Sequence, residues 1–108
     1  MCEFHQLYLG QEGYIVVCKN CGCFQLCYGR LVLDLSKHDF GILHILIKKH
    51  LNEEYDYPDE ELKQIIIPTP HSGVNLLLSM TELRQFDEIL QEAENELDAL
   101  SLLSLFQN

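Results

Sequence analysis

The chain has 108 residues and a formal net charge of −10 at pH 7, from 17 acidic and 7 basic side chains. This length suits one domain with a core of its own, so we expect a single domain spanning residues 1–108. Duplex nucleic acid and anionic membranes are normally bound through a basic surface, which this excess of acidic residues excludes. We therefore expect no nucleic-acid partner and no membrane partner.

The cellular location follows from the start of the chain and from the lengths of its apolar runs. Residues 1–5 lack the basic and apolar segments of an export signal. The apolar runs are far shorter than the roughly 20 residues that cross a bilayer. A cytoplasmic protein is predicted. Five cysteines in a reducing compartment are a poor disulfide framework, which favours metal ligation or packing in the core.

Short β-prone runs in the first third of the chain predict two hairpins. Residues 10–13 form a polar turn framed by two glycines, and Gly29-Arg30 forms a tight turn between the later runs. The four predicted strands cover residues 4–9, 14–18, 24–28 and 31–35.

A helix is predicted to begin after Ser36, because Asp39 follows three positions later in a pattern similar to a capping box. Apolar residues then recur at helical spacing and widen into a broad stripe, which places this helix at the centre of the core. The stripe consists of Phe40, Leu43, Ile47 and Leu51, widened by Ile42, Ile45 and Leu46.

Residues 52–61 carry six acidic side chains and Pro58 without apolar periodicity. They predict a solvated loop, with an acidic binding loop as the alternative. Two further strands follow at residues 63–67 and 74–78, joined by a segment with two prolines and a glycine. The expected fold class is α+β, with a mostly antiparallel sheet of about six strands packed against two helices.

The last helix is predicted from the capping box formed by Ser79 and Glu82. Its apolar seam fits packing on the sheet, and it also fits a homodimeric coiled coil. The apolar stretch at residues 100–106 predicts a contact with a protein partner or with a second copy of the chain. The seam consists of Leu83, Phe86, Leu90, Ala93, Leu97 and Leu100.

Four potential metal ligands have the spacing of a zinc site: Cys2-x2-His5, twelve residues, then Cys18-x2-Cys21. If residues 10–13 form a four-residue turn, opposed positions sum to 23, so that His5 faces Cys18 and Cys2 faces Cys21. Opposed residues have Cβ atoms about 5 Å apart, close enough to share an ion. The pattern predicts a zinc-ribbon-like hairpin with a closed, structural zinc site.

Other interpretations of the cysteines remain open. Cys18 and Cys21 could be buried for packing alone, or could form a redox pair, although such pairs normally open a helix. Cys23 and Cys27 are assigned to packing, and either could replace His5 or Cys2 as a ligand.

No catalytic or phosphate-binding motif can be assigned. The leading hypothesis is a zinc-stabilised, non-catalytic interaction or accessory module. The alternatives are a small-molecule-binding protein or enzyme with a pocket near His71, and an acidic regulator of a basic partner.

The chain resembles a family of short uncharacterised proteins from Bacteroidetes-type bacteria. The resemblance is carried by the paired Cys-x2-His and Cys-x2-Cys motifs, Gly13-Tyr14-Ile15, the segment 25–29 and the helix start at 78–83. It implies a bacterial cytosolic setting and no assigned activity. Cys2, His5, Cys18 and Cys21 are the positions that match.

Overall fold

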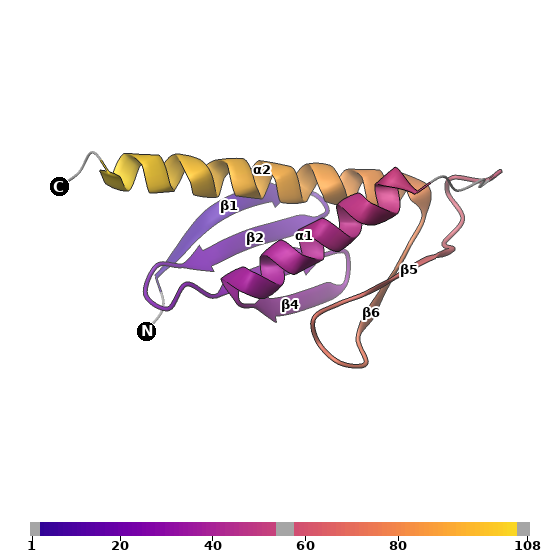
Figure 1. The fold of residues 1–108 in the computed structure, drawn as a ribbon, viewed down its shortest axis with the longest axis horizontal. Helices are drawn as coiled ribbons and strands as arrows, with labels where there is room; N and C mark the ends of the chain where they lie inside the picture. The colour runs from indigo at the N-terminus through magenta and orange to yellow at the C-terminus, as the bar shows by residue number, and fades with distance from the viewer. Residues whose placement is uncertain (1–2, 54–57, 106–108) are drawn as a thin grey trace. The chain divides into compact units, whose positions relative to one another are not determined.

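The computed structural model describes residues 3–53 and 58–105 and contains six strands and two helices in these ranges (Figure 1). This confirms the expected α+β class. The chain divides into two compact units, one within residues 1–37 and 89–108 and the other comprising residues 38–88. The elements are β1 (Phe4–Gly10), β2 (Gly13–Cys18), β3 (Phe24–Tyr28), β4 (Leu31–Leu35), α1 (Lys37–Asn52), β5 (Ile65–Pro68), β6 (Asn75–Leu78) and α2 (Met80–Leu105).

The first unit contains a four-stranded antiparallel sheet in the order β1-β2-β3-β4. Both predicted hairpins are confirmed. Gly10 pairs with Gly13 across the first turn. Tyr28 pairs with Leu31 across the second, where Gly29 takes a φ of 60° that favours glycine.

The register of the first hairpin differs from the prediction beyond its turn. Leu9 pairs with Tyr14 as expected, but the register shifts between Gln6 and Tyr8. The extra residue of this bulge, Leu7, has a buried side chain. After the bulge Phe4 pairs with Cys18, so the expectation that His5 faces Cys18 is wrong.

The sheet of the first unit has one apolar face and one more polar face. The apolar face packs with the part of α2 that belongs to this unit, where Ile89, Leu90 and Ala93 are buried. On the outer face, the Tyr14 hydroxyl donates to Gln25 Oε1 at 2.7 Å, and Gln25 Nε2 donates to Asp34 Oδ1 at 3.3 Å. The buried sheet positions are Ile15, Val17, Phe24, Leu26, Leu33 and Leu35.

The second unit pairs β5 with β6 in a two-stranded antiparallel sheet. The six expected strands are therefore divided between two sheets. In α1, Phe40, Leu43 and Ile47 are buried as predicted, but Ile45 is 68% exposed. The buried stripe of α1 is narrower than predicted, because Ile42 and Ile45 are exposed and Leu46 is only half-buried.

The start of α2 confirms the predicted capping box. The Ser79 amide donates to Glu82 Oε1 at 3.0 Å, and the Glu82 amide donates to Ser79 Oγ at 3.1 Å. The seam is buried within the single chain from Leu83 to Ala93 and is half-buried at Leu97 and Leu100. Packing within the chain therefore accounts for the first part of the seam. Neither helix of the described residues is long and apolar enough to cross a membrane.

Candidate metal centre

The turn between β2 and β3, residues 18–23, carries three cysteines and is called the cysteine turn below. The Cys18 amide donates to the Cys23 carbonyl at 2.8 Å, and the Gly22 amide donates to the Cys18 carbonyl at 2.8 Å. Gly22 has a φ of 78°, a conformation that L side chains rarely adopt. These bonds fold the chain tightly enough to bring Cys18, Cys21 and Cys23 into one short turn.

The side chains of the cysteine turn differ in exposure but lie close together. Cys18 is 1% exposed, whereas Cys21 and Cys23 are exposed. A hydrogen bond with the Cys21 thiol raises the pKa of Cys23, and the charges of Cys21, Cys18 and Asp34 raise it further. The two exposed thiols of the turn are therefore linked to each other.

The cysteine turn is tied to the N-terminal strand next to the first predicted ligand. The Lys19 amide donates to the Glu3 carbonyl at 2.7 Å, and the Glu3 amide donates to Asn20 Oδ1 at 3.2 Å. Glu3 directly follows Cys2 in the sequence. Cys2 itself lies outside the described residues.

In the pairing of β1 with β2, His5 does not lie opposite a residue of the cysteine turn. It pairs with Val17, whose side chain is buried on the apolar face. Its Nε2 is 3.3 Å from Glu96 Oε1 of α2, which belongs to the same unit. Side chains alternate between faces along a strand, so His5 is on the opposite face from Asp34, the neighbour of Cys23.

Cys18, Cys21 and Cys23 therefore share one short turn, whereas His5 pairs with Val17 on β2. Within residues 3–53 and 58–105, no three His, Cys, Asp or Glu side chains are already arranged to hold an ion. The four-ligand zinc site stays a prediction.

The assignment of Cys23 and Cys27 to packing is only half right. Cys27 is half-buried within β3, opposite Tyr14 and Val32. Cys23 precedes β3, is exposed and contacts Cys21. The signal for this was present in the sequence, because Cys21-Gly22-Cys23 places two thiols around a residue suited to a sharp turn.

A second cluster of ionisable groups lies in the second unit. His44 is buried, and its Nε2 is 3.2 Å from Asp87 Oδ1. Lys48 Nζ donates to the same oxygen at 3.1 Å. The Asp87 carboxylate therefore joins two side chains of α1 to α2, which is an arrangement that supports packing.

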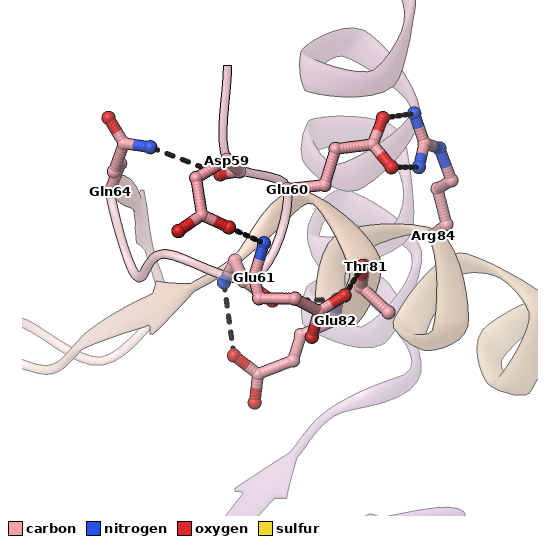
Figure 2. Close-up of polar contacts among 8 residues, drawn as sticks. Asp59, Glu60, Glu61, Gln64, Thr81, Glu82 and Arg84 are labelled. Carbon is pink, nitrogen blue, oxygen red and sulfur yellow. Dashed lines mark hydrogen bonds and ion pairs between the residues drawn. The ribbon is translucent and has the colours of Figure 1, made fainter. Parts of the chain in front are cut away.

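Residues 58–61 of the acidic segment are exposed, as the prediction of a solvated loop requires, and they are anchored to the start of α2 (Figure 2). Both Glu60 carboxylate oxygens accept from Arg84, at 2.9 and 3.0 Å, and this contact lowers the pKa of Glu60. The Thr81 hydroxyl donates to Glu61 Oε1 at 2.5 Å, and the Thr81 amide donates to the Glu60 carbonyl at 3.1 Å. Residues 54–57 of the predicted loop lie outside the described residues.

The loop that carries His71 closes the β5–β6 hairpin. The Thr69 amide donates to the Val74 carbonyl at 3.1 Å, and the Thr69 hydroxyl donates to the same oxygen at 2.6 Å. His71 is exposed near the tip, next to Gly73 with its φ of 81°. These contacts explain the turn and add no support to the hypothesis of a small-molecule site.

The fold and the cysteine turn define a small α+β protein whose four-stranded sheet carries a thiol-rich turn. The chain belongs to a family of unknown function (DUF6686), whose model matches residues 1–107. A search of curated proteins gave no match, and neither did a search of solved structures. The expected membership of an uncharacterised family is confirmed to this extent.

Proposed function

We propose that this protein is a cytoplasmic, zinc-stabilised interaction or accessory module without catalytic activity. The observation that carries the proposal is the cysteine turn, which holds Cys18 and Cys21 in one short segment next to the N-terminal strand. A two-residue gap between cysteines on a tight turn is a usual way to present two ligands to one zinc ion.

The starting assignment of the ligands is the set that the spacing predicts: Cys2, His5, Cys18 and Cys21. Glu3 supports the inclusion of Cys2, because its hydrogen bonds to Lys19 and Asn20 tie the residue next to Cys2 to the cysteine turn. Four protein ligands leave no position on zinc for water or substrate, so such a site is structural. When bound, the ion would crosslink the N-terminus to the β2–β3 turn.

The interaction role is supported by the apolar side chains near the end of α2. Leu102 is 58% exposed and Leu103 is 57% exposed. Adjacent exposed leucines on a helix are typical of a surface that meets a protein partner or a second copy of the chain.

Metal content tests the proposal. The protein, purified without chelator, should contain one zinc per chain by elemental analysis, and Cys18→Ser and Cys21→Ser should each lose most of it. Cys27→Ser is the matched control, because Cys27 lies within β3, and it should retain the metal. A wild-type protein without stoichiometric metal contradicts the proposal.

A further inference from the structure

We propose that one row of side chains on the C-terminal part of α2 binds a basic, amphipathic helix of a protein partner. This inference rests on the proposed function, because it names the kind of partner that the interaction role requires. The row, called the acidic–apolar row below, consists of Glu92, Glu96, Leu100 and Leu103.

The side chains of the acidic–apolar row lie on one side of α2, because successive members are three or four residues apart. Glu92 is exposed, Leu100 is half-buried and Leu103 is 57% exposed. Glu96 Oε1 is 3.3 Å from Nε2 of His5 on β1, yet the Glu96 side chain remains 46% exposed. The row therefore presents two carboxylates followed by two leucines along one helix.

Packing within the first unit is supplied by another side of α2. Leu90 and Ala93 are buried there against the sheet. Leu103 lies beyond these residues and leaves more than half of its surface in water. A large apolar side chain that extends an apolar stripe into solvent is typical of a surface that a partner covers.

The charge around the leucines favours a basic partner. Residues 89–105 carry four acidic side chains and no lysine, arginine or histidine. The last turn of α2 therefore has no cation to offset the negative end of the helix dipole. Glu92 and Glu96 are four residues apart, a spacing at which like charges destabilise a helix. Lysine or arginine side chains of a partner would offset both effects.

The spacing of the row indicates the shape of the partner. Leucines that recur every three or four residues beside charged side chains form seams between helices, and the charges select the partner. A second copy of the chain would bring like charges together, since each copy has a net charge of −10. The occupant that fits is a helix with one apolar face flanked by basic side chains.

The test measures the binding of a designed peptide to the full chain, in samples of known zinc content. The peptide has about three heptads with leucine at the a and d positions and lysine at e and g, and its counterpart has glutamate in place of lysine. In fluorescence anisotropy, the basic peptide should bind at least about tenfold more tightly than the acidic counterpart. Added salt should weaken this binding, because it screens the charges.

Leu103→Asn tests the apolar part of the row. It should weaken binding at least about tenfold, because burial of a leucine contributes that much to an interface. Leu102→Asn is the matched control, because Leu102 is 58% exposed on the same turn but lies about 100° further round the helix. It should change the affinity by less than about twofold.

The double variant Glu92→Gln, Glu96→Gln tests the acidic part. It should bind the basic peptide about fivefold more weakly and with a smaller dependence on salt. The matched control is Glu94→Gln, Asp98→Asn, which removes the same charge from the other side of α2. It should retain most of the affinity and of the salt dependence.

Equal binding of the two peptides, or binding of neither, would overturn the inference, as would equal losses in Leu103→Asn and Leu102→Asn. A dimer in light scattering that Leu103→Asn dissociates would also overturn it, because a second copy would then cover the row. The zinc content of the same samples tests the proposed function separately. Far-UV circular dichroism of each variant shows whether a loss of binding follows from unfolding.

Discussion

Tyr8 and Glu12 form a pair whose chemistry depends on one hydrogen bond in the first hairpin. The Tyr8 hydroxyl donates to Glu12 Oε2 at 2.7 Å. This bond and partial burial raise the pKa of Tyr8 to about 12, from an ordinary value of 10.0, and the charge of Glu92 on α2 contributes further. The same bond lowers the pKa of Glu12.

The titration of Tyr8 can be measured directly. In wild type minus Tyr8→Phe difference spectra, the Tyr8 phenolate should appear near pH 12, and Glu12→Gln should shift it down towards pH 10. Because the pKa is higher in the folded state than in the unfolded chain, the contribution of this group to stability is complete below about pH 10. That contribution is lost as the pH rises through about 12. A midpoint near 10 in the wild type would contradict the pairing.

The cluster of His44, Lys48 and Asp87 predicts how burial changes the contribution of a side chain to the unfolding free energy. His44 is buried whereas the Lys48 side chain is 48% exposed, although both contact Asp87 Oδ1. His44→Ala removes packing and a hydrogen bond, so it should cost about 2–3 kcal/mol of unfolding free energy. Lys48→Ala should cost less than about 1 kcal/mol, since exposed ion pairs contribute little. Urea unfolding measures both, and equal costs would show that burial of His44 is unimportant.

Local features of the helices and strands could be predicted from the sequence, whereas the bulge in β1 could not. The capping box at Ser79 and the turn at Gly29 were predictable, because each depends on a few neighbouring residues with fixed backbone preferences. The bulge at Leu7 was not, because an apolar residue at that position fits a regular strand equally well until the tertiary core takes up its side chain. The same bulge explains why the predicted contact between His5 and Cys18 failed while Cys18 and Cys21, joined by a local turn, lie together.

In the first hairpin, Gly13 has a backbone conformation and a close neighbour that other residues would not tolerate easily. Gly13 has a φ of 152°, and a Cβ there would lie 1.9 Å from the carbonyl oxygen of Cys27 on β3. Gly13→Ala must therefore displace β3 or strain the turn, at a cost of about 2–4 kcal/mol.

Gly41 in α1 provides the matched control. A Cβ at this position would meet no atom within 4 Å, so Gly41→Ala should stabilise the helix by about 0.5–1 kcal/mol. Thermal unfolding of the two variants should show shifts of opposite sign. A neutral effect of Gly13→Ala would mean that β2 and β3 do not approach as closely as the structure shows.

Across the whole molecule, both units leave apolar side chains exposed in addition to their cores. Leu102 and Leu103 do so on α2, and Ile66 and Leu77 do so as a directly opposed pair on β5 and β6. The division of six strands into two sheets depends on contacts between distant segments, so the local patterns that identified each strand did not determine it. A net charge of −10 adds self-repulsion that favours solubility but opposes compaction, which makes a stabilising crosslink useful.

The central claim is that a zinc ion stabilises this fold, and thermal unfolding with and without a strong chelator tests it most directly. A ligand that binds only the folded state raises its stability. The melting temperature should therefore fall when zinc is removed and recover when one equivalent is returned. In a Cys18→Ser, Cys21→Ser double variant the chelator should have no effect. An unchanged melting temperature in the chelated wild-type protein, with complete metal removal verified, would contradict the account.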